Sequence, residues 1–535
     1  MIPGHNRAFD IIVVGAGHNG LVAAGYLARA RLTVLLLEQR DTVGGLCATA
    51  EIFPGIRGNL AANSAHNLEP KIMADLELES FGLKWSETIE PNSFVMFPGG
   101  RRIVSWPDRE ALRQEYDRFS PGEYDRHMET LNEMSDLGRA LDVSFFEAPP
   151  SFGEVASRPK TLAQEEVFRR VMFGSAADVV NHRLRSEEAR TSLAMLAAAG
   201  NFIGPATPGS AYQLMQRALY RGSSALQGKA TIKATADFNS RAAIGGMGAI
   251  TAAMERSARA AGVVVRTSAA VRSIEASADG VTGVLLDSGE LFTSRAVLSA
   301  LNPKLTMTSL VAAESLPDDA RAAYESLEMA GCMGKVYLEL DGLPRFACAT
   351  SEEENQALVR CGFRIGDTVD LMQESFERAQ RGDWSGAPVI YGLVQTAFDP
   401  TLAPQGRHLM SLSVSYAPYD VEGGWDAHGD SWARHVIATL REHITNLDAI
   451  VRNQRYLTPR DLESEFGLLG GNALHGDVIV SRMFDWRPIP GFSDYTTPVR
   501  GLYLGSNGTW PANYVSGLPG HNAAHRVIAD LIRAR

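Results

Sequence analysis

The sequence predicts an α/β fold in which two domains are interleaved along the chain. Three observations predict it: a glycine-rich turn between an apolar strand and a helix near the start, a second glycine turn near the middle, and a last strand and helix at the end. The chain has 535 residues, too many for one hydrophobic core, so we expect two or three domains.

The first glycine turn lies within residues 9–20. Its apolar start predicts a buried strand, and the residues after the turn predict a helix. Gly15 permits the tight turn, Gly17 lets the backbone approach a pyrophosphate, and Gly20 lets the helix pack close to the strand. The helix also offers its N-terminal N–H groups to the phosphates. This order of elements is typical of a Rossmann-type dinucleotide-binding domain.

An acidic residue stands where the ribose of a dinucleotide would lie. We expect a second strand over residues 33–37, and Glu38 follows it. A carboxylate there accepts hydrogen bonds from ribose hydroxyls and would repel a 2′-phosphate, which disfavours NADP. An ordinary glycine-rich turn would not explain Glu38, so the segment predicts dinucleotide binding.

Two further features favour FAD over NAD. Gly44-Gly45 lies just past the acidic residue and lets the loop run along the pyrophosphate and ribityl chain of a longer cofactor. At the end of the chain, a strand over 501–505 leads through a loop to a helix from Gly520. The N-terminus of that helix can stabilise negative charge on a reduced flavin. Strand and helix alone would only close a Rossmann sheet; with the glycine pair they predict FAD.

The middle of the chain predicts a helical insertion and a second sheet. Residues 124–141 and 165–185 have the pattern of helices. The glycine turn at 245–248 then opens a helix over 249–261, after which the dinucleotide-binding domain resumes. Further strands are expected at 263–267, 271–277, 283–287, 296–300, 335–340 and 410–416, and a further helix at 370–381.

These patterns divide the chain into five expected segments. The FAD-binding domain is expected to comprise residues 1–100, 241–305 and 496–535. A helical insertion of the substrate domain is expected over 101–240, and the sheet and helices of the substrate domain over 306–495. The acidic run 351–355 predicts an exposed loop, and Arg101-Arg102 predicts a solvated face.

Composition excludes several classes of function. The net charge of −11 argues against nucleic acid and against an anionic membrane surface. The four cysteines form no C-x-x-C pair and no zinc spacing, so neither disulfide reduction nor a metal site is expected. The polar start leaves no room for a signal peptide, and no apolar stretch is long enough for a transmembrane segment. We expect a cytoplasmic protein; a peripheral membrane contact stays open.

Several motifs together resemble a known superfamily. Residues 10–20, Glu38-x-Arg40 and Gly44-Gly45 resemble the FAD-binding start of the phytoene desaturase and amine oxidase superfamily. The turn at 245–248 resembles the glycine turn that precedes the resumed FAD domain in the desaturases. The chain also resembles the group named after pyridine nucleotide-disulfide oxidoreductase domain-containing protein 2. Motifs of that group are found at 399–404, 416–419, 457–463, 470–476 and 519–524.

The resemblance implies an FAD-containing oxidoreductase without disulfide chemistry. It implies flavin contacts at Leu46, along the loop through Gly517, and at Val271, where a resumed strand would touch the adenine. The full expected FAD-binding set is Gly15, Ala16, Gly17, Asn19, Gly20, Glu38, Gln39, Arg40, Gly44, Gly45, Leu46, Val271, Gly505, Ser506, Val515, Ser516 and Gly517.

The terminal loop departs from the desaturase pattern. Desaturases have Thr-His-Pro-Gly-Gly-Gly-Val beside the isoalloxazine ring, whereas residues 509–515 here read Thr-Trp-Pro-Ala-Asn-Tyr-Val. The side chains of Ala512, Asn513 and Tyr514 are therefore expected to line the reacting face. This disfavours a long polyene and favours a smaller or more polar substrate.

Four residues are candidates for catalysis. Asn513 and Tyr514 would face the substrate, and Tyr514 either donates to a substrate oxygen or fills space. His66 follows the FAD loop where relatives place substrate-facing residues; the alternative is a loop histidine bonded to backbone. Trp510 either packs or forms a lid over the ring, or is itself a reacting group.

Together these features predict an FAD-dependent dehydrogenase, desaturase or oxidase that takes a hydride from a C–C or C–N bond of a small to medium apolar molecule. Two alternatives stay open. One is a redox-neutral hydratase or isomerase acting on an unsaturated acid such as a 2-haloacrylate, and the other is a non-catalytic flavoprotein in a complex. The sequence identifies neither the substrate, the electron acceptor nor the oligomeric state.

Overall fold

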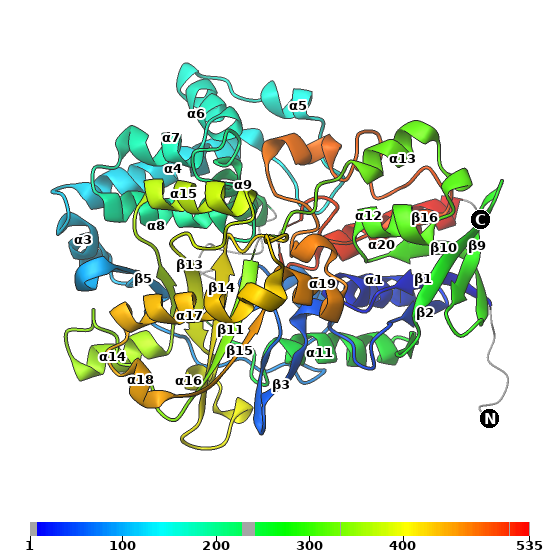
Figure 1. Ribbon diagram of the computed structural model, residues 1–535. Helices are drawn as coiled ribbons and strands as arrows, with labels where there is room; N and C mark the ends of the chain where they lie inside the picture. The colour runs from blue at the N-terminus through cyan, green and yellow to red at the C-terminus, as the bar shows by residue number, and fades with distance from the viewer. Residues whose placement is uncertain (1–7, 227–240, 332, 513, 534–535) are drawn as a thin grey trace.

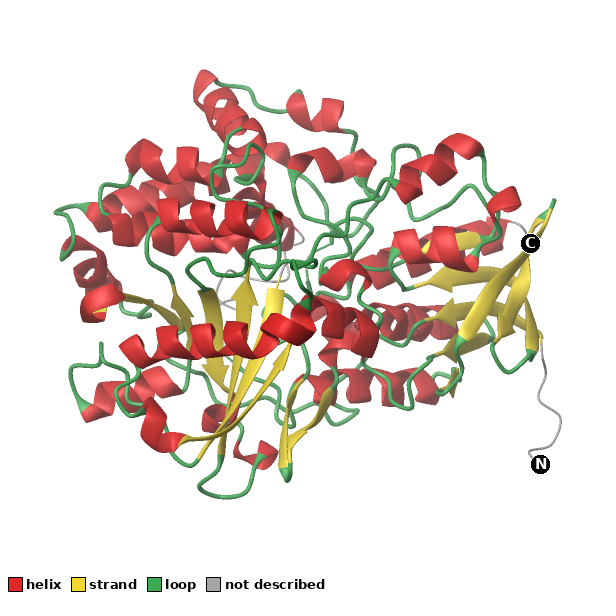
Figure 2. Cartoon of the chain, in the orientation of Figure 1, coloured by secondary structure: helices red, strands yellow, loops and turns green. Residues whose placement is uncertain are grey.

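The computed structural model describes residues 8–226, 241–331, 333–512 and 514–533. Two seven-stranded sheets organise this portion of the chain (Figure 1). Figure 2 shows them as two groups of strands, each with helices beside it. The predicted α/β fold with interleaved domains is therefore confirmed.

The first sheet is built around a parallel core. β1 pairs in parallel with β2 on one side and with β10 on the other, while β8 and β9 add an antiparallel hairpin next to β10. Its strands come from three separate regions of the sequence, as the two glycine turns and the final strand predict. They are β1 (Ala8–Val14), β2 (Val34–Leu37), β7 (Val264–Arg266), β8 (Val271–Ser277), β9 (Gly280–Leu286), β10 (Leu291–Ser299) and β16 (Leu502–Leu504).

Helices cover both faces of this core, which explains why its strands are apolar throughout. Ile11 and Val13 face the cluster that includes α1, whereas Ile12 and Val14 face the opposite cluster. α1 packs against both α11 and α20. The helices around this sheet are α1 (His18–Arg29), α2 (Pro70–Asp75), α11 (Met247–Ala260), α12 (Pro303–Leu305), α13 (Asp318–Glu325) and α20 (Leu518–Arg533).

The second sheet is mixed, in the order β15-β11-β14-β13-β12-β5-β6. Its only parallel pair within the described residues is β5 with β12. A separate two-stranded hairpin, β3 (Thr49–Phe53) with β4 (Ile56–Asn59), lies beside β14. The strands of the second sheet are β5 (Ser93–Phe97), β6 (Arg101–Val104), β11 (Met333–Leu340), β12 (Gly362–Ile365), β13 (Val389–Val394), β14 (His408–Ser415) and β15 (Val451–Leu457).

One face of the second sheet is apolar and packs on α17 (Trp425–His443). Val336, Phe363 and Leu412 join Trp432 and Val436 of that helix in a single buried cluster. The remaining helices of this half are α14 (Glu352–Val359), α15 (Val369–Gln380), α16 (Gln395–Phe398), α18 (Leu447–Ile450) and α19 (Pro459–Phe466).

A group of helices lies above the other face of the second sheet, beside β13 and β14 in Figure 1. Contacts join α4 to α6, α7 and α9, and join α8 to α9 and α15. This layer positions the side chains that face the sheet from above. It consists of α3 (Arg109–Asp117), α4 (Glu123–Leu141), α5 (Phe152–Ala156), α6 (Leu162–Phe173), α7 (Ala176–Arg183), α8 (Glu187–Ala198) and α9 (Tyr212–Leu226).

Three sequence expectations about local structure are wrong. Residues 165–185 form two helices, because Ser175 caps α7 with a capping box that includes Asp178. The acidic run at 351–355 begins α14 with Ser351 as its N-cap. Arg102 is only 6% exposed and pairs with Glu354 at 2.5 Å, so the Arg101-Arg102 pair is not a solvated face.

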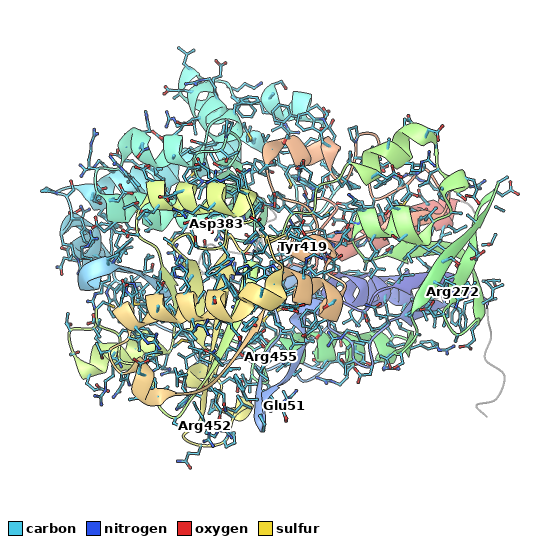
Figure 3. The ribbon with its side chains drawn as sticks, viewed as in Figure 1. Glu51, Arg272, Asp383, Tyr419, Arg452 and Arg455 are labelled. Atoms are coloured by element: carbon cyan, nitrogen blue, oxygen red, sulfur yellow. The ribbon has the colours of Figure 1, made fainter. Side chains whose placement is uncertain are left out.

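Charged residues lie on the outer strands of both sheets. Figure 3 shows Arg272 on β8, and Arg452 and Arg455 on β15. Such charges discourage edge-to-edge pairing with another chain. Among the described residues, no helix combines the length and apolarity needed to cross a membrane. The cytoplasmic location stays a prediction.

Candidate functional site

The phosphate-binding turn predicted from the sequence joins β1 to α1. Gly15 adopts a φ of 95°, which favours glycine, and α1 begins at His18 with Gly17 as its N-cap. A Cβ at Gly20 would clash with the carbonyl oxygen of Gly15, so this glycine allows helix and strand to pack closely. A Cβ at Gly17 would meet nothing within 4 Å, so the backbone here faces open space.

Glu38 lies at the end of β2, next to this turn. Its carboxylate accepts hydrogen bonds from the backbone N–H of Ala16 at 2.9 Å and of Arg40 at 3.0 Å. These two bonds hold the carboxylate at the strand end, where a ribose would lie in a dinucleotide site.

The second glycine pair lies against the phosphate-binding turn. Gly44 donates to the carbonyl of Ala16 at 2.8 Å and forms a β-bridge with Gly17. A Cβ at Gly45 would lie 3.3 Å from the Cα of Gly17. The close approach explains the need for glycine at these positions and places the two turns side by side.

A cavity of about 460 Å³ opens at this edge of the first sheet. It brings together residues from the start of the chain, from β8, from the segment after β10, from α19 and from the segment after β16. Of the expected FAD-binding residues, the cavity is lined by Gly15, Gly17, Asn19, Glu38, Gln39, Arg40, Gly45, Leu46, Val271 and Ser506.

The other expected FAD-binding residues lie behind this lining. Gly505 packs on Ala523 of α20, and the Ser516 hydroxyl accepts from the N–H of Leu518 at the start of that helix. Gly517, with a φ of 79°, contacts Val22 of α1. The expected residues outside the lining are Ala16, Gly20, Gly44, Gly505, Val515, Ser516 and Gly517.

The cavity fits a polar ligand that carries anionic and hydroxyl groups. Within the described segments of the chain, four buried polar atoms on its walls have no hydrogen-bond partner: His18 Nε2, Asn19 Oδ1, Arg40 Nη1 and Asn507 Oδ1. Buried polar groups are normally satisfied, so these atoms indicate a partner that is not protein. The guanidinium of Arg40 also lies 5.3 Å from the ring centroid of Phe466 on α19, which restricts its position. These features suit a dinucleotide cofactor.

Several residues of the cavity wall were not predicted from the sequence. Asn302 follows β10, while Phe466 and His475 come from the segment around α19. His475 makes a 3.1 Å hydrogen bond with the hydroxyl of Ser506, which joins the α19 segment to the segment after β16. Burial, followed by the charges of Arg487 and His18, lowers the pKa of His475 to about 3.

The terminal loop joins the cavity to the helical layer. The Tyr514 hydroxyl donates to the carbonyl of Ala199 at 2.6 Å and accepts from the Gln213 amide at 2.5 Å. Burial lowers the pKa of His18 in the phosphate-binding turn to about 4, and a hydrogen bond with the Tyr514 backbone opposes that shift. Asn513 lies outside the described residues.

Trp510 is fully buried and packs in the core. Its ring stacks on Phe484 with centroids 5.3 Å apart and meets Phe145 edge-on at the same distance. Of the roles considered for Trp510, namely packing, a lid or a reacting group, these contacts support packing. Trp510 is not among the residues that line the cavity.

His66 makes a 2.7 Å hydrogen bond with the side chain of Ser64. Burial lowers the pKa of His66 to about 4, and the nearby charge of Arg217 on α9 acts in the same direction. The imidazole is therefore neutral at neutral pH. The bond that His66 makes is to a side-chain hydroxyl, whereas the alternative expected from the sequence was a bond to the backbone.

Strand register places four polar side chains in a row that the sequence did not predict. Arg364 on β12 lies opposite Tyr391 on β13, Tyr391 lies opposite Ser413 on β14, and Ser413 lies opposite Lys335 on β11. Residues directly opposite one another share a face of a sheet, here the face away from α17. We call these four residues the polar row.

Lys335 is fully buried at one end of the polar row. Its ammonium lies within hydrogen-bonding distance of Ser411 Oγ at 3.0 Å, Asn63 Oδ1 at 3.1 Å, Ser413 Oγ at 3.3 Å and the Ala61 carbonyl at 3.4 Å. Burial lowers the pKa of Lys335 to about 7. A lysine in a strand whose other residues, apart from Glu339, are uncharged is the signal that could have identified this position.

The polar row is linked to the cofactor cavity by a short piece of backbone. Ala62 donates to the carbonyl of Leu46, which lines the cavity, and the neighbouring Ala61 accepts from Lys335. Only the backbone of Ala61 and Ala62 therefore separates the amine of Lys335 from Leu46 in the cavity wall.

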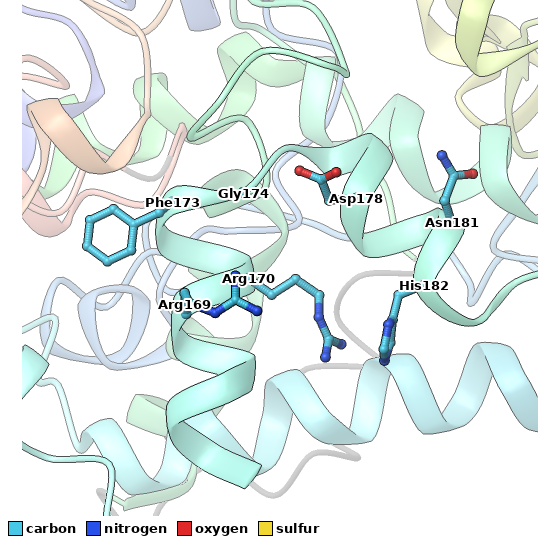
Figure 4. Close-up of a pocket in the computed structure, with 7 residues that line it drawn as sticks. All are labelled: Arg169, Arg170, Phe173, Gly174, Asp178, Asn181 and His182. Atoms are coloured by element: carbon cyan, nitrogen blue, oxygen red, sulfur yellow. The ribbon is translucent and has the colours of Figure 1, made fainter. Parts of the chain in front are cut away.

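A second cavity, of about 480 Å³, lies between α6 and α7 (Figure 4). Two of its charged groups already have protein partners. Arg170 pairs with Glu166 at 2.8 Å and Glu133 at 3.5 Å, and Asp178 belongs to the capping box of α7. These pairs indicate a structural role, so we assign the candidate site to the cavity at the first sheet.

Residues 20–443 match the family of flavin containing amine oxidoreductases, and the chain belongs to this family. It is an FAD-dependent oxidoreductase, as the glycine turns and the resemblance predicted. The residues that line the cavity at the first sheet fit this cofactor.

Named relatives extend this assignment over nearly the whole chain. The chain is 33% identical to pyridine nucleotide-disulfide oxidoreductase domain-containing protein 2 of Rattus norvegicus, across 98% of this chain and 94% of the rat protein. It is 22% identical to the lycopene-forming phytoene desaturase of a Paracoccus species, across 98% of both chains. Putrescine oxidase bound to putrescine shares its fold, with a TM-score of 0.65 at 20% identity over 99% of both chains.

Proposed function

We propose that this flavoprotein is a dehydrogenase, desaturase or oxidase that oxidises a C–C or C–N bond of a small to medium organic molecule. The observation that carries the proposal is the position of Lys335, a buried amine with a pKa near 7, two backbone residues from the cofactor cavity. When bound, FAD accepts a hydride from a C–H bond, and the substrate must then lose a proton.

Lys335 is our candidate acceptor for that proton at Nζ. Because its pKa is about 7, a fraction of the molecules carries a neutral amine at neutral pH. Ser411, Ser413 and Asn63 hold the amine in place and stabilise its protonated form. His66, with a pKa of about 4, is a weaker base, so we assign it to substrate positioning.

We further propose that the residues lining the cavity hold FAD. Gly17 leaves room for the pyrophosphate, Glu38 meets a ribose, and Arg40 supplies a positive charge. Tyr514, tied to α8 and α9, borders the side on which the substrate lies. The expected role of Asn513 on that side stays a proposal from the sequence alone.

One observation favours a second candidate, the redox-neutral conversion of an unsaturated acid. Arg364 lies in the polar row, and a guanidinium is well suited to an organic acid. In that reaction Lys335 would move a proton without net oxidation of the substrate.

Anaerobic mixing of the holoenzyme with a panel of amines, alcohols and saturated acids tests the first candidate. Loss of the oxidised flavin absorbance with formation of the dehydrogenated product supports it. Turnover of an unsaturated acid only after pre-reduction, with no net consumption of electrons, supports the second candidate and overturns the first.

A further inference from the structure

Arg364 of the polar row is influenced by the charge of a second arginine, Arg217. Arg364 projects from β12 toward α8, where it donates a hydrogen bond to the carbonyl of Ser192 at 2.9 Å. Tyr391, its cross-strand neighbour, donates to the carbonyl of Met195 on the same helix. The two side chains therefore lie between the second sheet and α8.

The second arginine, Arg217, comes from α9. Gln213, Gln216 and Arg217 are spaced i, i+3 and i+4 along the helix and so share one face. Gln213 bonds to the Tyr514 hydroxyl, and Gln216 donates to the carbonyl of Pro511 at 2.7 Å. The face that carries Arg217 is thus turned toward the terminal loop.

The charge of Arg217 acts on three groups at the polar row. It lowers the pKa of His66 and that of Arg364, in both cases after the larger effect of burial. It also opposes the burial that raises the pKa of Tyr391. Arg217 is therefore close enough for its charge to act on His66, Tyr391 and Arg364.

Neither arginine has a carboxylate partner among the described residues. Two other half-buried or buried arginines do have carboxylate partners: Arg102 lies 2.5 Å from Glu354, and Arg126 lies 2.6 Å from Glu123. The buried Arg487 has none, but its guanidinium donates to several backbone carbonyls. In addition, Nε of Arg217 is buried without a hydrogen-bond partner in the described chain. Burying two like charges without an anion is costly, which points to an anion that is not protein.

We propose that Arg217 and Arg364 bind the oxyanionic group of an acidic substrate, whose carbon chain extends along the polar row toward Lys335. This inference rests on the proposed function, because it names the substrate class of the same site. Guanidinium groups present N–H donors in a planar fork that matches two oxygens of a carboxylate or a phosphate. Tyr391 lies between Arg364 and Ser413 in the row, so the chain of the acid would pass its ring.

Matched ligand pairs test this proposal on the holoenzyme. Straight-chain carboxylates from pentanoate to decanoate are compared with the primary amides of the same length, and alkyl phosphates with the corresponding alcohols. Binding is measured by titration calorimetry and by the change in the visible spectrum of the oxidised flavin. We expect at least one series to bind roughly 10- to 100-fold more tightly in its anionic form. The tighter series identifies the oxyanion.

Variants locate the anion. Arg217→Gln and Arg364→Gln are each expected to remove most of this preference, while affinity for the neutral analogue and FAD content stay unchanged. Arg360→Gln is the matched control, since Arg360 is exposed and close in sequence to Arg364. If a glutamine variant does not retain FAD, Arg364→Lys, which keeps the charge but not the planar fork, is expected to lower the preference.

The outcomes separate this inference from the proposed function. No preference for the anion in the wild-type protein, or full preference in both glutamine variants, overturns the oxyanion site. A clear preference without flavin reduction or turnover by any acid contradicts the proposed function and leaves the oxyanion site supported.

Discussion

The side-chain amide of Gln213 on α9 donates a 2.5 Å hydrogen bond to the hydroxyl of Tyr514 in the terminal loop. The same hydroxyl donates to the carbonyl of Ala199 at the end of α8. Tyr514 therefore ties the loop before α20 to two helices of the other half of the molecule. It does so with a φ of 54°, in the left-handed region where the desaturase pattern has glycine.

We expect Tyr514→Phe to weaken this tie. Removing the hydroxyl leaves the Gln213 amide and the Ala199 carbonyl without this partner, which costs about 1–3 kcal/mol in the free energy of unfolding. FAD should be retained, because Tyr514 does not line the cofactor cavity. Turnover should fall as the loop loses its anchor. Chemical denaturation and steady-state kinetics measure these effects.

Tyr324→Phe is the control for that change. The Tyr324 hydroxyl is buried without a hydrogen-bond partner in the described residues, so its removal is expected to be neutral or stabilising. Equal destabilisation by both substitutions would show that the hydrogen bonds of the Tyr514 hydroxyl do not add to the free energy of unfolding.

Two glycines of the phosphate-binding turn should respond differently to the same substitution. At Gly17 an added methyl group meets open space inside the cavity, and its φ of −69° is compatible with alanine. Gly17→Ala should therefore fold normally and bind FAD at least roughly tenfold more weakly. At Gly20 the methyl group clashes with the Gly15 carbonyl, so Gly20→Ala should destabilise the fold by about 1–3 kcal/mol.

FAD content after purification, FAD titration and the apoprotein melting temperature distinguish the two glycine variants. Normal FAD affinity in a stable Gly17→Ala protein would show that the pyrophosphate lies elsewhere.

The cofactor half of the site could be predicted because its information is local. Gly15, Gly17 and Gly20 lie within one turn of chain, and Glu38 follows the next strand, so spacing alone indicates their geometry. The helix break near Ser175 was missed although the capping signal is also local: Ser175 and Asp178 bond to one another across three residues.

The polar row could not be predicted from the sequence, because its members are distant in sequence and meet only through strand register. A shift of one residue in β13 would turn Tyr391 to the apolar face beside Phe363 and Leu412. The sequence shows how apolar and polar residues alternate within each strand, but it does not show which strands pair or in which register. Arg217 is still harder to place, since it reaches the row from a helix.

Lys335 should give the stability of the protein a characteristic pH dependence. Burial lowers its pKa from an ordinary value of 10.5 to about 7. Between these two values the unfolded chain holds one more proton than the folded chain, so the free energy of unfolding should rise with pH from about 7 to 10.5. Lys335→Met should remove this rise. The difference between wild-type and variant denaturation curves across that range measures it.

The control is Lys84→Met, because Lys84 is exposed and should leave the pH dependence unchanged. A wild-type profile that matches Lys335→Met throughout would show that Lys335 keeps its charge in the folded protein and is not a proton acceptor near neutral pH.

Arg487 should be the most sensitive arginine for both folding and FAD binding. It is 3% exposed, and its guanidinium donates to the carbonyls of Asn507 at 2.7 Å, Leu474 at 2.8 Å and Gly476 at 3.2 Å. Arg487→Met leaves these carbonyls unsatisfied, so we expect a loss of about 3 kcal/mol or more in the free energy of unfolding. FAD affinity should fall as well, because Asn507 lines the cavity.

Arg482→Met is the control: it removes a surface ion pair with Glu328 and should cost no more than about 1 kcal/mol in the free energy of unfolding. Similar losses for the two variants would contradict the structural role of Arg487.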